Sequence, residues 1–341
     1  MKLNFEEIKA ISTGAVRFEE DESGIKLYRY TKEQEKLYEN THEEFFYKSQ
    51  QTAGIKLVFR TNSSHLAIKT KIVLEPAALT RSRQYFSFDV FVNGKAIGYL
   101  DCYDGLANVD DYVNITLVQD EYEKEFQLGI GEKVVHIYLP WGVQPIIQEI
   151  FLDDGAFIEP VKAKKRLLAF GDSITQGYDA MRSSNSYIAR LARYLEADET
   201  NKAIGGECIF PAIAETKEDF EPDYITVAFG TNDWSKKSRD VFQVNSKIFY
   251  QTLRKNYPNT PIYVITPIWR ADKDKEVEFG LFEDVEKDIR VAVQGIDNLK
   301  VIRGYDLVPK DTSYFGDLRL HPNDKGFEAY FEGLKKELLE V

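Results

Sequence analysis

The spacing of apolar residues changes near residue 160, and this change constrains the fold of the chain more than any other feature of the sequence. Before it, apolar residues recur at every second position, as in residues 86–92, and the pair Asn93-Gly94 that follows is typical of a tight hairpin turn. Further short runs typical of strands are residues 55–59, 66–70 and 133–139. Several short strands without helical runs between them predict an N-terminal β-sandwich of the jelly-roll type over residues 1–160.

After residue 160, compact apolar runs alternate with longer segments that have the period of helices. The expected strands are residues 167–170, 224–229, 262–265 and 301–302, and the expected helices are residues 187–195, 241–257, 276–293 and 324–341. This alternation predicts a parallel sheet with helices on both faces, so we expect residues 161–341 to form a three-layer α/β/α domain. The polar segment Pro160–Lys165 is the expected linker.

The charge of the chain argues against two classes of partner. There are 44 Lys and Arg residues against 56 Asp and Glu residues, a net charge of −12, whereas proteins that bind nucleic acid or anionic membranes need a basic surface. No apolar run approaches the roughly 18 residues needed to span a bilayer. The first residues, Met1–Glu7, lack the apolar stretch of a signal peptide, so the expected location is cytoplasmic.

Three short polar motifs follow predicted strands, where ligand sites form in open α/β sheets. The first, Gly171-Asp172-Ser173, comes directly after the run 167–170. A serine at such a turn faces the cleft, and the N-terminus of the next helix offers backbone N–H groups to an anion. The alternative is that Ser173 only caps the helix, which is a common role of serine. This motif alone leaves both interpretations open.

The other two motifs offer a hydrogen-bond donor and a base. Asn232, in Gly230-Thr231-Asn232-Asp233, could donate to a developing oxyanion or close an Asx turn. His321, in His321-Pro322-Asn323-Asp324, has acids beside it and could take the proton of a serine hydroxyl and return it to a leaving group. No cluster of His, Asp or Cys has the spacing of metal ligands, and a serine mechanism needs neither metal nor cofactor, so we expect none.

Together the motifs resemble those of the SGNH hydrolases, or GDSL esterases, in the family's order over residues 166–341. The resemblance implies a flavodoxin-like SGNH domain in which Ser173 is the nucleophile and His321 the base. It also implies an oxyanion hole formed by Ser173, Gly206 and Asn232, with Gly205 as the neighbouring alternative to Gly206. The Gly-x-Ser-x-Gly elbow of α/β-hydrolases is absent at Ser173, which argues against that fold.

The sequence departs from the family pattern at the acid that accompanies the histidine. The family places this acid three residues before the histidine, where this chain has Leu318, and Asp317 lies four residues before it. Asp317 could still turn onto the imidazole and complete a triad, which is the interpretation we favour. Alternatively, a backbone carbonyl orients His321 and leaves a Ser-His dyad, as in some carbohydrate esterases of the superfamily, and Asp317 is only a turn residue.

A jelly-roll before such a hydrolase domain resembles the layout of bacterial carbohydrate acetylesterases. The resemblance implies an esterase that removes a small acyl group, most simply acetyl, from a carbohydrate or related alcohol through an acyl-enzyme on Ser173. Trp234 and Trp269 both follow predicted strands. Each could stack on a sugar ring or line a small acyl pocket, and burial in the core is the alternative for both.

Two other functions stay open at the level of sequence. The chain could be an esterase or thioesterase for a non-sugar substrate such as a lysophospholipid, or a non-catalytic sugar-binding protein with a decayed hydrolase domain. Decay would tend to remove at least one of Ser173, Asn232 and His321, and all three are present. The expected partner is therefore a small-molecule or oligosaccharide ester. Tyr and Phe side chains on an exposed sandwich face could also form a homo-oligomer interface.

Overall fold

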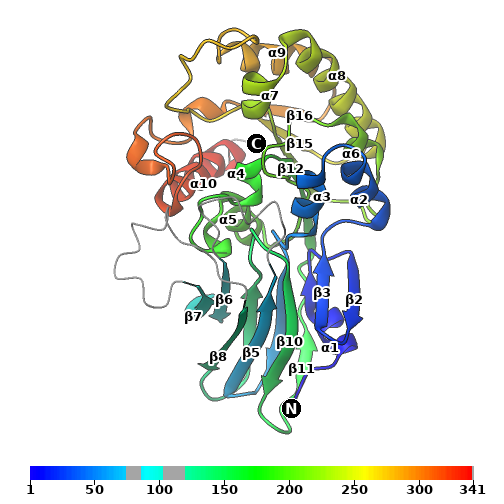
Figure 1. The fold of residues 1–341 in the computed structure, drawn as a ribbon, viewed down its shortest axis with the longest axis vertical. Coiled ribbons are helices and arrows are strands. Elements are labelled where there is room, and N and C mark those ends of the chain that lie inside the picture. The colour runs from blue at the N-terminus through cyan, green and yellow to red at the C-terminus, as the bar shows by residue number, and fades with distance from the viewer. Residues whose placement is uncertain (74–85, 103–119, 340–341) are drawn as a thin grey trace.

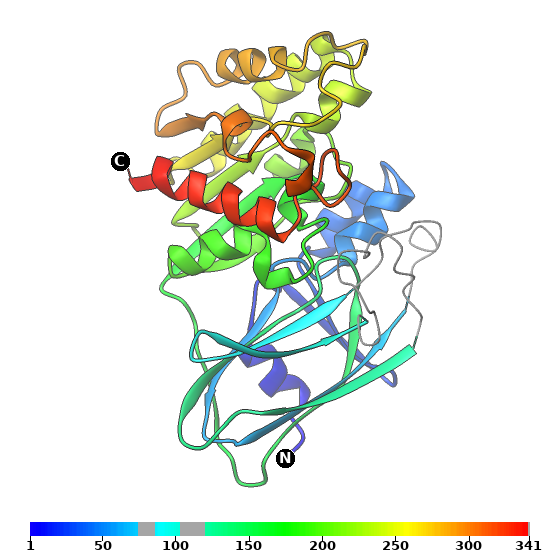
Figure 2. The same cartoon turned by 90° about the vertical axis from the view of Figure 1, so that its left-hand side faces the viewer.

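A computed structural model gives the structure of the chain and describes residues 1–73, 86–102 and 120–339. Its strands form two antiparallel sheets before residue 161 and one parallel sheet after it (Figure 1). Figure 2 shows the parallel sheet and its helices on one side of the molecule and the β-sandwich on the other. The predicted class, an α/β unit preceded by a β-sandwich, is confirmed.

The two antiparallel sheets enclose one apolar core. The first has the order β1-β4-β9-β6-β7, with β11 paired to β4, and the second has the order β2-β3-β10-β5-β8. Buried side chains from both sheets, such as Phe59, Phe88 and Ile150, belong to a single apolar cluster. The strands of the first sheet are β1 (Ser12–Thr13), β4 (Lys56–Thr61), β6 (Ser87–Val92), β7 (Lys95–Asp101), β9 (Lys133–Tyr138) and β11 (Ile158–Pro160). Those of the second are β2 (Arg17–Asp21), β3 (Gly24–Tyr28), β5 (His65–Ile72), β8 (Asp120–Gln127) and β10 (Pro145–Leu152).

The parallel sheet has the order β13-β12-β14-β15-β16 and separates two helical layers. Successive side chains of a strand point to opposite faces. Leu168 and Phe170 of β12 therefore enter one apolar cluster, and Leu167 and Ala169 enter the other. The strands are β12 (Lys165–Gly171), β13 (Ala197–Asn201), β14 (Tyr224–Ala228), β15 (Ile262–Ile265) and β16 (Leu299–Ile302).

Helices cover both faces of the parallel sheet, as predicted. Those on the Leu168 face are α6 (Pro211–Glu215), α8 (Arg239–Asn256) and α9 (Asp284–Ala292), and those on the Leu167 face are α5 (Tyr187–Tyr194) and α10 (Asp324–Leu339). The shorter helices are α4 (Ser173–Gln176), α7 (Thr231–Lys236), η2 (Ser183–Asn185), η3 (Gly304–Asp306) and η4 (Thr312–Tyr314). The predicted helix over 276–293 is helical only in α9, because Gly280 turns the chain with a φ of 102° just before it.

The expectation that the first half has no helices is wrong. It contains α1 (Phe5–Ile11), α2 (Lys32–Glu39) and α3 (Glu43–Gln50). The first two begin at capping boxes formed by Asn4 with Glu7 and by Thr31 with Gln34. Figure 1 shows α2 and α3 beside α6, at the parallel sheet, and contacts between α2 and α6 agree with this.

The chain crosses from the sandwich to the parallel sheet between the end of β11 at Pro160 and the start of β12 at Lys165. Tyr30 and Tyr38, however, belong to the same apolar cluster as Leu168, so side chains from the first half complete the core of the second. A division into domains at this point stays a prediction. No helix in the described part of the chain is both long and apolar enough to cross a membrane.

Candidate active site

Ser173 is the first residue of α4 and follows β12 after a tight turn. The residue that caps α4 is Asp172, whose Oδ1 accepts a hydrogen bond from the N–H of Ile174 at 3.0 Å. The turn requires glycine at 171, because a Cβ there would lie 2.3 Å from Thr175 Oγ1 and 2.9 Å from the carbonyl oxygen of Ala228. Ser173 is thus one residue past the capping position, which leaves its hydroxyl to other contacts.

The hydroxyl of Ser173 meets the imidazole of His321. Ser173 Oγ lies 2.8 Å from His321 Nε2. His321 lies in the loop between η4 and α10, residues 315–323, which is called the histidine loop below. Its carbonyl oxygen accepts a 2.8 Å hydrogen bond from the N–H of Gly316. A serine hydroxyl at this distance can pass its proton to an imidazole nitrogen.

Asp317 holds the other side of the imidazole. Its Oδ2 lies 3.0 Å from His321 Nδ1, and its Oδ1 accepts hydrogen bonds from the N–H groups of Arg319, Leu320 and His321 at 2.9, 2.6 and 3.0 Å. Burial would raise the pKa of Asp317. This effect of burial is smaller than the combined effect of the hydrogen bond and charge of His321 and of the N–H groups of the loop. Together they hold the pKa of Asp317 well below its usual value. An ionised carboxylate therefore faces the imidazole.

The loop between β13 and α6, residues 202–210, contains the two glycines considered for the oxyanion hole and is called the glycine loop below. The N–H of Gly205 donates to Gln176 Oε1 at 2.7 Å, and a Cβ on Gly205 would lie 2.7 Å from the ring of Tyr178. The N–H of Gly206, whose φ is 87°, makes no hydrogen bond within the described part of the chain. This difference favours Gly206 over Gly205 as a donor to a ligand.

Asn232, in the first turn of α7, is hydrogen-bonded to the same loop. Its Nδ2 donates to the carbonyl oxygen of Glu207 at 3.1 Å, and the residue is 8 % exposed. A side-chain amide has two hydrogens, so this bond leaves one for another acceptor. The structure thus joins the Asn232 amide to the glycine loop, and Gln176 joins that loop to α4.

Three buried acids lie next to these residues in the chain. Burial raises the pKa of Asp172 to about 6 and that of Asp233 to about 7. It also raises the pKa of Glu207 well above its usual value. At neutral pH, Asp233 and Glu207 therefore carry less negative charge than exposed carboxyl groups would, which suits a site where negative charge forms.

An aromatic wall beside His321 was not expected from the sequence. The ring of Tyr178 lies 5.6 Å from the imidazole of His321, and the ring of Trp141 lies 4.8 Å from Tyr178, between ring centroids. Trp141 Nε1 donates to the carbonyl oxygen of Ala180 at 2.9 Å, which fixes the indole. Trp141 lies between β9 and β10, and only its position in a loop between two sandwich strands marks it in the sequence.

The two tryptophans considered for substrate contact or for the core lie in different environments. Trp234 is 1 % exposed, donates from Nε1 to the carbonyl oxygen of Gly280 at 2.9 Å and packs against Phe282. This burial in the core argues against the predicted sugar contact, because the first turn of α7 points the indole inward. Trp269 is partly buried, with its ring 5.4 Å from that of Phe315, and its contact with sugar stays a prediction.

One group of acids and histidine in the described part of the chain has the spacing of metal ligands. Side-chain atoms of Asp179, Asp317 and His321 all lie within 4.8 Å of one another. Asp317 and His321 are already hydrogen-bonded to each other, and His321 is hydrogen-bonded to Ser173. This arrangement favours orientation of the imidazole as the role of the group.

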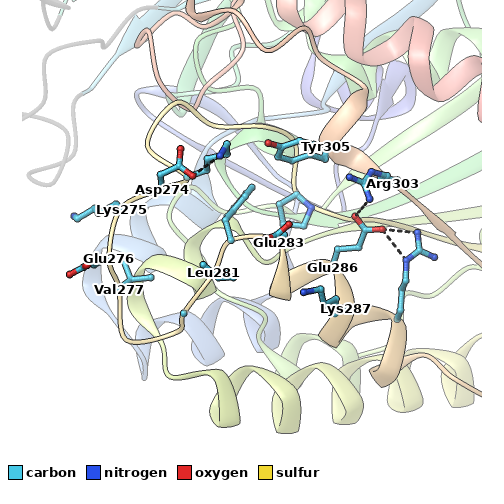
Figure 3. A pocket seen from close by; sticks show the side chains of 15 residues that line it. Asp274, Lys275, Glu276, Val277, Leu281, Glu283, Glu286, Lys287, Arg303 and Tyr305 are labelled. Atoms are coloured by element: carbon cyan, nitrogen blue, oxygen red, sulfur yellow. Dashed lines mark hydrogen bonds and ion pairs between the residues drawn. The ribbon is translucent and has the colours of Figure 1, made fainter.

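A groove of about 730 Å³ lies beyond β15 and β16, beside α9 (Figure 3). Its lining carries both signs of charge, and Glu286 contacts both Arg290 and Arg303. Neither Ser173 nor His321 lines it. The candidate active site is therefore the meeting point of α4, the glycine loop, α7 and the histidine loop rather than this groove.

Solved structures with the same two-part fold are only distantly similar in sequence. A salicylyl-acyltransferase from a tetracycline biosynthetic pathway is 21 % identical with a TM-score of 0.78, over 96 % of this chain and 94 % of that chain. A putative GDSL-like lipase from Bacteroides ovatus is 22 % identical with a TM-score of 0.77, over 100 % and 97 %. A family two carbohydrate esterase from Clostridium thermocellum, solved with cellohexaose, is 15 % identical with a TM-score of 0.65, over 96 % and 98 %.

A family model matches most of the second half of the chain. No curated protein matches the sequence. Residues 169–329 match the model of the GDSL-like lipase/acylhydrolase family, and this range spans the turn at Ser173, the glycine loop, α7 and the histidine loop. Over residues 169–329 the chain is therefore similar to the GDSL-like lipase/acylhydrolase family, and this match supports a carboxylic ester hydrolase.

Proposed function

We propose that this protein is a serine esterase that removes a small acyl group, acetyl, from a carbohydrate or a related alcohol. The observation that carries the proposal is the series of hydrogen bonds from Ser173 Oγ to His321 Nε2 and from His321 Nδ1 to Asp317 Oδ2, at 2.8 and 3.0 Å. A hydroxyl becomes a good nucleophile when an adjacent base takes its proton. A carboxylate on the other nitrogen holds the imidazole in the tautomer that can do so.

The reaction would proceed through an ester of Ser173. Ser173 Oγ attacks the carbonyl carbon of the substrate while its proton passes to His321 Nε2. The bond to the alcohol oxygen then breaks, and His321 returns the proton to that oxygen. A water molecule, deprotonated by His321, attacks the acyl-enzyme, so that acetate leaves and Ser173 regains its hydroxyl proton.

The negative oxygen of each tetrahedral intermediate would accept hydrogen bonds from three donors. They are the N–H groups of Ser173 and Gly206 and the second amide hydrogen of Asn232. The Ser173 N–H lies in the first turn of α4, where a helix has no internal acceptor for it. Donors placed where charge develops lower the barrier itself, and loss of one costs about 10²- to 10³-fold in kcat.

Two observations support a sugar as the alcohol. The Tyr178 ring beside His321 offers a flat aromatic face that is partly exposed, and such faces suit contact with ligand rings. The similar fold from Clostridium thermocellum is that of a carbohydrate esterase. Acetyl as the acyl group follows from the resemblance of the sequence to carbohydrate acetylesterases.

The test is ester hydrolysis across acyl lengths. We expect the wild type to cleave 4-nitrophenyl acetate faster than the butyrate or octanoate and to release acetate from acetylated xylo-oligosaccharides. Ser173→Ala should lose activity by at least about 10³-fold. Ser238→Ala, at a helix start where the side chain makes no capping hydrogen bond, is the matched control and should keep wild-type activity.

Other outcomes would point elsewhere. Activity that rises with acyl length would contradict the acetyl proposal and favour a non-sugar ester such as a lysophospholipid. No turnover of any ester, together with equal oligosaccharide binding by wild type and Ser173→Ala in calorimetry, would favour a sugar-binding protein.

A second candidate is acyl transfer to an alcohol in place of water. The fold likeness to an acyltransferase over nearly the full length of both chains supports it, because both reactions share the acyl-enzyme. Mass spectrometry of products formed with 4-nitrophenyl acetate and a sugar acceptor separates the two, since transfer yields the acetylated acceptor and hydrolysis yields acetate alone.

A further inference from the structure

We propose that Lys48, from the first half of the chain, is a positioning residue that holds and strengthens the Gly206 N–H as an oxyanion donor. The inference rests on the proposed function, in which Gly206 donates to the tetrahedral intermediate. Lys48 lies in α3, outside the range 169–329 that matches the family. It acts through the peptide unit between Gly205 and Gly206.

The ammonium group of Lys48 is held at one place. Its Nζ donates to the carbonyl oxygen of Gly205 at 2.6 Å and lies 2.6 Å from Glu44 Oε1. The side chain is 8 % exposed, and the Nζ lies 5.7 Å from the centre of the Tyr178 ring. Lys48 is therefore a buried cation aimed at the backbone of the glycine loop rather than a surface charge.

The carbonyl of Gly205 and the N–H of Gly206 are the two ends of one planar, conjugated peptide group. A cation at the carbonyl oxygen draws electron density toward that oxygen and leaves the N–H more positive. Hydrogen bonds linked through such a group strengthen one another, and the effect is larger where water is excluded. Lys48 thus makes the Gly206 N–H a stronger donor, and its benefit grows as negative charge develops on the substrate.

Neighbouring backbone groups of the loop have partners that fix its orientation. The carbonyl oxygen of Gly206 accepts from Lys236 Nζ at 2.6 Å, and that of Glu207 accepts from Asn232 Nδ2 at 3.1 Å. The Gly205 N–H donates to Gln176 at 2.7 Å. The Gly206 N–H is the donor that these bonds leave over for a ligand.

Arg29 ties α3 to the same loop. It is fully buried and donates to the carbonyl oxygens of Asn201 and Ala203 at 3.0 and 2.6 Å, and to the carbonyl oxygen of Lys48 itself at 2.8 Å. The backbone of Lys48 and the start of the glycine loop therefore share one anchor. This anchor holds the ammonium group of Lys48 at a fixed distance from the carbonyl oxygen of Gly205.

Lys236 provides a matched comparison. It is also a lysine bonded to a carbonyl of this loop, but the carbonyl of Gly206 belongs to the next peptide group, whose N–H is that of Glu207 and donates to Ile204. Removing Lys236 takes away the same charge near the same place without touching the Gly205–Gly206 peptide. Equal effects of both lysines would mean that only net charge matters.

The experiment compares Lys48→Met, Lys48→Arg and Lys236→Met in the full chain with 4-nitrophenyl acetate. We expect Lys48→Met to lower kcat about ten- to a hundredfold with KM within about twofold, because the lost interaction belongs to the transition state. Lys48→Arg should restore most of kcat, and Lys236→Met should lose less than Lys48→Met.

A boronic acid adds a readout that a purely structural role would not move. It forms a tetrahedral anion on a serine hydroxyl, so its inhibition constant should weaken in Lys48→Met by the same factor as kcat/KM. Thermal unfolding checks that each variant is folded, and Lys48→Gln, which also removes the charge and should show the same loss of kcat, carries the test if Lys48→Met is not. Wild-type kcat in folded Lys48→Met, or equal losses in both methionine variants, would overturn the inference. An inactive wild type would instead overturn the proposed function.

Discussion

At the residue scale, Leu318 lies at a left-handed turn in the loop that brings Asp317 to His321. Leu318 has a φ of 55° and is 65 % exposed. This left-handed conformation is uncommon for leucine and turns Asp317 toward the imidazole across one extra residue. The sequence left the triad and the dyad open because a leucine carries no signal for such a turn, whereas glycine or asparagine would.

A substitution at Asp317 separates the triad from the dyad. Asp317→Asn can still accept the N–H groups of the loop, but its amide then donates to His321 Nδ1 and favours the tautomer that cannot take the serine proton. We expect kcat for 4-nitrophenyl acetate to fall on the order of 10³-fold. Asp311→Asn, a capping residue at η4, is the control. A loss of only a few-fold at Asp317 would favour the dyad.

At the element scale, the predicted strands and long helices carried clear apolar periods, and the elements that complete the site did not. The bounds of β4, β12, β14 and α8 were predicted within a few residues, because the apolar residues that these elements bury recur with the period of a strand or helix in the sequence. α3 is bounded by polar residues and supplies Lys48 to a loop far along the chain. β13 reads Ala-Asp-Glu-Thr-Asn and is an edge strand, so no apolar run marks it.

Asp233, in the first turn of α7, should make the free energy of unfolding depend on pH. Burial raises the pKa of Asp233 to about 7, against 3.8 for an exposed aspartate. Between these values the folded chain keeps a proton on Asp233 that the unfolded chain has lost, so the contribution of Asp233 to the free energy of unfolding falls as pH rises from 4 to 7. Asparagine cannot ionise and can still accept from the N–H of Ile209.

Urea unfolding at pH 4, 6 and 8 measures this effect. The stability of Asp233→Asn relative to the wild type should rise with pH, by about 4 kcal/mol at most. Asp240→Asn, at an exposed position in α8, should show no such trend. A difference between Asp233→Asn and wild type that stays constant with pH would contradict the buried, protonated state of Asp233.

At the scale of the whole molecule, the two halves are joined by buried polar contacts as well as by apolar packing. Gly14 lies so close to Gly54 and Glu199 that a Cβ would be 2.6 and 2.7 Å from their carbonyl oxygens. Arg29 spans the same junction. Its side chain donates hydrogen bonds to two carbonyl oxygens of the first half, those of Lys48 and Gln51, and to two at the end of β13 and just after it, those of Asn201 and Ala203. No sequence pattern predicts such a contact, because it pairs residues more than 170 positions apart.

Arg29→Met should therefore destabilise the whole protein. It would leave buried carbonyl groups on both sides of the junction without donors, at a cost of roughly 3–5 kcal/mol. Arg60→Met is the control, because Arg60 is 43 % exposed and pairs with Glu132 and Glu159 at the surface, where such pairs contribute little to stability. Urea unfolding of both variants measures the difference, and equal stabilities would show that the junction does not depend on Arg29.

The central claim is that Ser173, activated by His321, forms a covalent intermediate, and labelling with a fluorophosphonate tests it most directly. We expect intact-mass spectrometry to show one adduct per wild-type chain and peptide mapping to place it on Ser173. Ser173→Ala should take up no label, and His321→Ala should be labelled far more slowly. An adduct at another residue, or equal labelling of Ser173→Ala, would contradict the account.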